Sequence, residues 1–113
     1  MSGPERPRVV ITGLGLITVL GSHVDEVWAN LVAGRSGIRR ITMFDASAHP
    51  CQIAGEIPEF DSGDFVPAKE ARRMSRASLL AFGAAQRAIA DSGHPTPFAD
   101  PERVGVSFGT AIG

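Results

Sequence analysis

The feature that most constrains the fold is the β-branched run Val9-Val10-Ile11-Thr12, which ends at Gly13. A short run of this kind, bounded by glycine, is typical of a buried strand followed by a tight loop. The pattern recurs near the other end, where residues 104–108 predict a second buried strand and residues 109–113 a second glycine loop. Because this pattern directly precedes the last residue, we expect the chain to be cut from a longer sequence.

Two helices are expected between these strands. Ser22 and Asp25 resemble a capping box that opens a helix ending near Gly34, which suits the position just after a helix C-terminus. Pro67 suits the first turn of a long helix that ends near Gly93. Five small residues on this second helix would let another element approach closely: Ala81, Gly83, Ala84, Ala85 and Ala88.

The segment 35–66 is irregular, and residues 53–57 are its only expected strand. So long a segment with little regular structure suggests a functional or interface role. The resulting order of strand, helix, weak strand, helix and strand predicts an α/β layered fold in one domain.

Composition excludes several classes of protein. A net charge of −1 on 113 residues provides no overall field for nucleic acid or an acidic membrane. A single Cys forms no internal disulfide, and no apolar run approaches the ~20 residues that span a bilayer. The basic residues Arg6 and Arg8 before residues 9–20 also resemble a signal peptide, but Glu5 and the interrupting glycines favour a strand and loop.

The loop Gly13-Leu14-Gly15-Leu16-Ile17-Thr18 invites a dinucleotide-binding hypothesis. That motif requires a third glycine where Thr18 stands, a helix directly after the loop and an acidic residue ~20 positions on. None of these is present, so a tight structural turn is favoured.

Cys51 is the only candidate thiol nucleophile. A catalytic Cys needs a base or a helix N-terminus to lower its pKa, and nearby His49 is adjacent only in sequence. We therefore expect a partly buried structural thiol. His23, His49 and His94 have no metal-ligand spacing with Cys51, so no metal site is expected.

A basic face at the start of the second helix has two interpretations. Positive charge in the first turns opposes the helix dipole, at a cost of up to ~1 kcal/mol per exposed charge. The face is either solvated and neutralised by preceding acids or a docking patch for an acidic partner, and the residues alone leave both open. The basic residues are Lys69, Arg72, Arg73 and Arg76, and the acids are Glu56, Glu59, Asp61 and Asp64.

Four stretches together resemble the N-terminal part of the β-ketoacyl-acyl-carrier-protein synthase II family. They are RVVITGLGLIT (residues 8–18), AGRSGI (33–38), FDAS (44–47) with IAGE (53–56), and KEARRM (69–74). The strand and glycine loop at residues 104–113 follow where the family has its next ones. Residues 1–113 are thus expected to be the N-terminal part of a β-ketoacyl synthase domain that ends before the catalytic residues.

The resemblance implies a thiolase-like layered α/β/α/β/α fold, a homodimer and a cytoplasmic condensing enzyme of fatty acid biosynthesis. In the family, an acyl group passes from acyl carrier protein to a Cys, and decarboxylation of the malonyl thioester supplies the attacking carbanion. Two histidines stabilise the developing negative charge. That Cys and both histidines lie beyond residue 113 in the family, so Cys51 and the histidines here are not catalytic, and no cofactor is implied.

Two sets of residues carry family roles within the chain. Lys69, Arg72 and Arg73 match positions that contact the acidic carrier protein, which favours the docking interpretation. Ile112 matches a residue that lines the acyl-chain pocket.

Departures from the family pattern suggest a divergent or polyketide-type member. Val19 replaces a usual Pro, Ser75 and Ala77 replace Asp and Phe, and Ala111 replaces Gly. The alternatives are a polyketide ketosynthase, its chain-length-factor partner, a nucleotide-binding module and a non-enzymatic carrier-protein binder.

Overall fold

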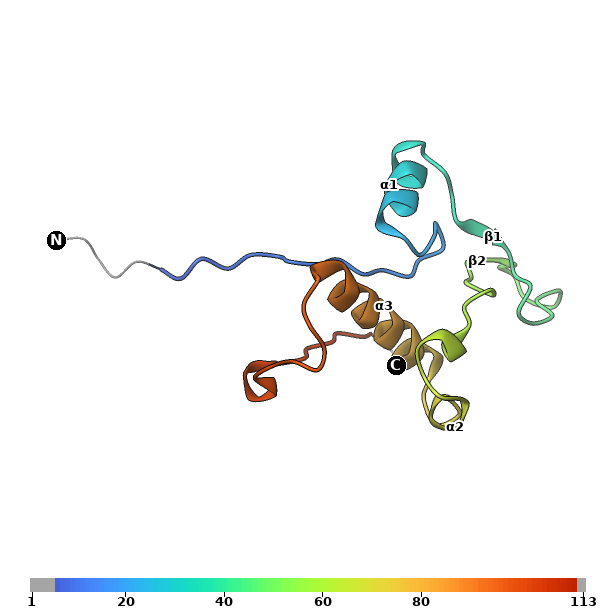
Figure 1. Ribbon diagram of the computed structural model, residues 1–113. Helices are drawn as coiled ribbons and strands as arrows, with labels where there is room; N and C mark the ends of the chain where they lie inside the picture. The colour runs from blue at the N-terminus through green and yellow to red at the C-terminus, as the bar shows by residue number, and fades with distance from the viewer. Residues whose placement is uncertain (1–5, 112–113) are drawn as a thin grey trace.

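Helix α3, Arg76–Ser92, lies at the centre of the computed structural model, which describes residues 6–111 (Figure 1). The Ser75 side chain accepts a hydrogen bond from the Ser78 backbone N–H at 3.1 Å and so caps the first turn. Gly93 ends the helix in the left-handed region, with φ of 65°. This end agrees with the sequence prediction, because only glycine adopts that conformation without a steric cost.

The long helix expected from residue 67 is broken into two. A short helix, α2, covers Ala68–Ala71, and α3 begins only after Ser75. Ser75 is extended, with φ of −68° and ψ of 158°, because its hydroxyl accepts a hydrogen bond from a backbone N–H in the first turn of the next helix. The apolar residues keep their helical spacing across the break, so the sequence pattern predicted one continuous helix.

Helix α1 covers Val24–Val32, with His23 at its N-cap. The expected Ser22–Asp25 capping box is wrong: the Glu26 carboxylate accepts a hydrogen bond from the Ser22 backbone N–H at 3.1 Å. The C-terminal prediction is confirmed. Gly34 has φ of 66°, its N–H donates to the Leu31 carbonyl, and the Arg35 N–H donates to the Asn30 carbonyl, which together form a Schellman motif.

The only sheet among residues 6–111 has two strands, β1 at Ile38–Arg40 and β2 at Ile53–Gly55. They pair antiparallel, with Ile38 opposite Gly55 and Arg40 opposite Ile53. The expected strand at 53–57 is thus confirmed in its first half, whereas β1 was not foreseen. Two 3₁₀ turns complete the elements, η1 at Ser62–Asp64 and η2 at Pro101–Arg103.

The two flanking strands are not formed. Residues 9–12 run extended but unpaired, and Val9 and Ile11 are 92% and 83% exposed. Residues 104–108 are likewise irregular, with Val106 79% exposed. The prediction of buried strands is wrong for this chain because a strand needs a neighbour for its backbone hydrogen bonds, and no such neighbour occurs among residues 6–111.

The first glycine loop lies directly on α3. A Cβ added to Gly13 would collide with the backbone of Ala88 and Ser92, and one added to Gly15 would collide with the backbone of Ala84 and Ala88. The Leu14 backbone N–H donates to the Asp91 carboxylate at 2.8 Å. The expectation that small residues let another element approach this helix is confirmed.

The structure is α/β but open. Its radius of gyration is 18.3 Å, against about 13 Å for a compact domain of this length. Among the described residues, only Ala46 and Val66 are buried hydrophobic residues. The part of the chain described here contains no helix both long and apolar enough to cross a membrane.

Candidate functional site

Three positive side chains gather on the short helix α2 and the turn after it. Arg72 and Arg73 lie three and four positions after Lys69, a spacing that places their side chains on the same helical face as Lys69. Backbone hydrogen bonds continue the turn beyond α2, because the Arg72 N–H donates to the Ala68 carbonyl and the Arg73 N–H to the Glu70 carbonyl. We call these three residues the basic patch.

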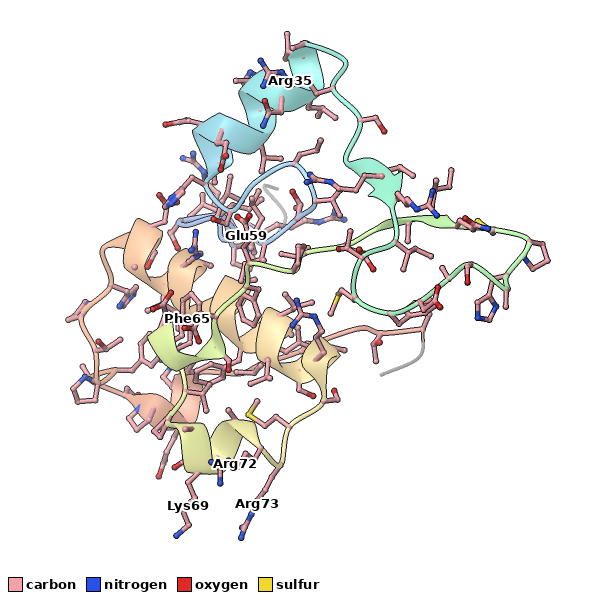
Figure 2. All side chains as sticks on the ribbon, turned by 90° about the vertical axis from the view of Figure 1, so that its right-hand side faces the viewer. Arg35, Glu59, Phe65, Lys69, Arg72 and Arg73 are labelled. Carbon is pink, nitrogen blue, oxygen red and sulfur yellow. The ribbon has the colours of Figure 1, made fainter. Side chains whose placement is uncertain are left out.

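The basic patch points away from the rest of the molecule. All three side chains are exposed, whereas Ala71 and Met74 are half-buried on the inner side. Figure 2 shows the patch at the lower edge, well separated from Glu59 and Arg35. The structure thus brings together the three residues predicted from the sequence as one solvent-facing surface.

Two of the acids expected to neutralise the patch are engaged elsewhere. The Glu56 carboxylate accepts hydrogen bonds from the Thr42 N–H at 2.8 Å, the Thr42 hydroxyl at 3.0 Å and the Met43 N–H at 3.2 Å. The backbone bond from Thr42 is the main reason that the pKa of Glu56 is lowered. Asp61 accepts from the Gly63 N–H at 2.7 Å and caps η1. These contacts weaken the interpretation of the patch as a neutralised surface.

Arg76, which the sequence placed on the same basic face, is exposed but contacts the segment that precedes α2. Its guanidinium donates to the Ile57 carbonyl and lies 5.7 Å from the centre of the Phe60 ring. Arg87 is half-buried: it donates to the Ser22 carbonyl, and its guanidinium lies 5.6 Å from the centre of the Phe65 ring. Neither contact was predicted from the sequence, although the two phenylalanines that precede α2 offered aromatic partners for an arginine.

A cleft of about 560 Å³ opens beside these contacts. Its walls carry charges of both signs together with the two phenylalanine rings, and they include Glu26, Arg35, Arg39, Glu59, Phe60, Asp64, Phe65 and Arg87. The Nε of Arg87 is buried and has no hydrogen-bond partner among residues 6–111. Within the same residues, no group of His, Cys, Asp and Glu side chains could hold a metal ion.

The remaining sequence candidates lie apart from the patch. Cys51 is exposed, not partly buried as expected, and its Sγ lies 3.5 Å from the Ile53 carbonyl oxygen. His49 contacts the Phe44 ring edge-on, at 5.8 Å between ring centres. Gly13 and Gly15 lie against α3, as a structural loop does. Ile112 lies outside the described residues.

Comparison with known proteins identifies the family. The model of the beta-ketoacyl synthase N-terminal domain matches residues 6–113. The chain is 42% identical over its whole length to 3-oxoacyl-[acyl-carrier-protein] synthase 2 of Synechocystis sp., and covers 27% of that protein. It is 47% identical to the granaticin polyketide putative beta-ketoacyl synthase 1 of Streptomyces violaceoruber, over 93% of this chain and 25% of the relative.

Solved structures agree. The ishigamide ketosynthase/chain length factor superposes with a TM-score of 0.71 at 41% identity, over 80% of this chain and 23% of that one. A beta-ketoacyl synthase from Burkholderia phymatum gives a TM-score of 0.65 at 37% identity, over 82% of this chain and 23% of that one. The chain belongs to the beta-ketoacyl synthase family, by the match of residues 6–113 to the model of the family's N-terminal domain. It spans about a quarter of the length of the curated relatives that it matches.

Proposed function

We propose that this chain supplies the N-terminal part of a 3-oxoacyl-[acyl-carrier-protein] synthase, which condenses acyl and malonyl thioesters with loss of carbon dioxide. The observation that carries the proposal is the 42% identity to 3-oxoacyl-[acyl-carrier-protein] synthase 2 over the whole chain. In this proposal the remaining part of the synthase completes the thiolase-like layered fold. It would cover the exposed apolar residues near both ends and supply the catalytic Cys and two histidines. A homodimer and a cytoplasmic location are parts of the same proposal.

The role proposed for this chain is docking. The basic patch at Lys69, Arg72 and Arg73 would receive an acidic acyl carrier protein, because complementary charge steers association and fixes orientation. The exposure of the three side chains and their common face support this role. Ile112 would line the acyl-chain pocket that receives the carried chain.

The test is charge reversal at the patch. Changing Lys69, Arg72 and Arg73 to Glu in the full-length synthase should raise the KM for acyl carrier protein about tenfold, since exposed charge pairs contribute up to ~1 kcal/mol each. The increase should shrink at high ionic strength because salt screens exposed charges. The charge-conserving set Lys69→Arg, Arg72→Lys and Arg73→Lys is the matched control. An unchanged KM in the reversed variant would mean that the patch is only a solvated face.

A second candidate is a polyketide ketosynthase or its chain-length-factor partner. The 47% identity to a granaticin ketosynthase and the match to a ketosynthase/chain length factor structure favour it specifically. The presence of the nucleophilic Cys beyond residue 113 separates a condensing subunit from a chain-length factor, and the products formed by the full-length protein separate the two pathways.

A further inference from the structure

The segment that leads into the basic patch is held against α3 by two stacked phenylalanine rings, each of which also contacts an arginine of α3. The Arg76 guanidinium lies over the Phe60 ring, at 5.7 Å from its centre. The Phe60 ring stacks on the Phe65 ring at 6.0 Å, with 13° between their planes. The Arg87 guanidinium lies over the Phe65 ring at 5.6 Å. We call these four residues the arginine–phenylalanine cluster.

Each arginine of the cluster also binds a distant backbone carbonyl. Arg76 donates to the carbonyl of Ile57, 19 positions away, and Arg87 donates to the carbonyl of Ser22, 65 positions away. A guanidinium can stack on a ring with its face while its edge donates a hydrogen bond, which an ammonium group cannot do with the same geometry. The cluster therefore joins the segment before α2 to α3 and to the loop before α1.

The α3 backbone is shaped to receive this cluster. A Cβ added to Gly83 would lie only 3.2 Å from the Phe65 ring and 2.8 Å from the Ile17 side chain. Gly83 is accordingly the only buried residue of α3. The absence of a side chain there allows the Phe65 ring to rest directly on the helix.

The cluster lies on both sides of α2 in the sequence. On the N-terminal side, Val66 and Pro67 connect Phe65 to α2, and Val66 is buried at 4% exposure. On the C-terminal side, Arg76 is the first residue of α3, directly after the Ser75 cap. The short helical turn that carries the basic patch is thus connected at both ends to residues of the cluster.

We propose that Phe60, Phe65, Arg76 and Arg87 are positioning residues that hold the basic patch in the orientation needed to receive the carrier protein. This inference rests on the docking function proposed above and adds to it. A helix of four residues has too few internal hydrogen bonds to hold its own orientation, so that orientation depends on the packing at its ends.

Two variants of the full-length synthase separate positioning from charge. Arg76→Lys keeps the positive charge but loses the stacked and hydrogen-bonded geometry, and Phe60→Leu changes no charge at all. Both should raise the KM for acyl carrier protein about three- to tenfold, because a misdirected patch loses charge contacts. The kcat and KM for a small acyl-N-acetylcysteamine thioester, which has no carrier-protein surface, should not change. Phe98→Leu is the matched control, because Phe98 packs on His94 and not on the cluster.

The outcomes distinguish this inference from the function on which it rests. If the patch reversal raises the KM for carrier protein but Arg76→Lys and Phe60→Leu do not, the positioning role is overturned and docking stands. If both cluster variants impair the small thioester as much as the carrier protein, the cluster is merely structural and the inference is again overturned. If the patch reversal leaves the KM unchanged, docking and positioning fail together.

Discussion

Glu56 shows how one carboxylate organises a loop in this chain. Its two oxygens accept hydrogen bonds from Thr42 and Met43, which are 14 and 13 positions away, and so connect the residue after β2 to the start of the loop that follows β1. Because these donors favour the ionised carboxylate, the pKa of Glu56 is lowered from its usual 4.5. A similar effect lowers the pKa of Asp45, which accepts from the Ser47 N–H at 3.0 Å.

Glu56→Gln should lower the melting temperature of the full-length protein at neutral pH, because a neutral amide is a weaker acceptor and presents only one oxygen. A lowered folded-state pKa adds stability that is present above the unfolded pKa and is lost as the pH falls through the folded one. The difference between wild type and variant should therefore disappear in acid, below pH 4.5. Thermal melts across this range, with Glu59→Gln as the control, would test this; a difference independent of pH would contradict it.

At the same scale, the sequence was sufficient to predict the basic patch but not the arginine contacts that hold it in place. Lys69, Arg72 and Arg73 lie on one helical turn, so their spacing alone brings them together. Arg76 was placed on the same basic face and Arg87 was given no role, because helical spacing shows only which face of a helix a residue occupies. Their actual partners are backbone carbonyls remote in sequence, which no local pattern reveals.

Among the elements, helices were predicted better than strands. Local residues were enough to predict helix α1 with its end at Gly34 and the end of α3 at Gly93. This is because a helix completes its backbone hydrogen bonds within itself. A strand completes them only with a neighbour, so residues 9–12 and 104–108 remain unpaired here despite their strong β pattern. Strand β1, with its sequence Ile38-Arg39-Arg40, has no such pattern and forms because β2 pairs with it.

The contact between the first loop and α3 makes a prediction at this scale. Gly15→Ala should destabilise the full-length protein by ~1–3 kcal/mol, because the new methyl group would meet the backbone of Ala84 and Ala88 and force the elements apart. Gly105→Ala is the control, since a Cβ at Gly105 has no heavy atom within 4 Å in this structure. The denaturant midpoints of the wild type and the two variants test this prediction. Equal losses of stability in Gly15→Ala and Gly105→Ala would refute the proposed crowding.

The whole molecule exposes far more surface than its mass requires. Its accessible area is 9470 Å², whereas a compact monomer of 11.9 kDa exposes about 6000 Å². Large apolar side chains contribute to the excess, with Val9, Trp28 and Val106 all more than half exposed. Patches of this kind mark surfaces that other protein normally covers. Composition could not predict this openness, because 43% hydrophobic content is ordinary for a closed domain.

The isolated chain is accordingly expected to bind a hydrophobic dye such as anilinonaphthalene sulfonate and to self-associate, whereas the full-length synthase should do neither to the same extent. It should also form no condensation product from acyl and malonyl carrier protein, in keeping with the proposed location of the catalytic Cys and histidines. Dye fluorescence, sedimentation and product analysis are the measurements. A monomeric chain without dye binding, or any condensation by it, would argue against this division of the enzyme.

The close packing of the first glycine loop on α3 has a genetic consequence. The atoms that an alanine at position 13 or 15 would strike belong largely to the backbone of the helix and not to the tips of its side chains. Trimming a side chain at residue 84 or 88 therefore cannot make room, because every amino acid carries the same main chain. A damaging change at either glycine has no simple second-site suppressor on the opposing helix, so these two loop positions are constrained regardless of how the helix facing them varies.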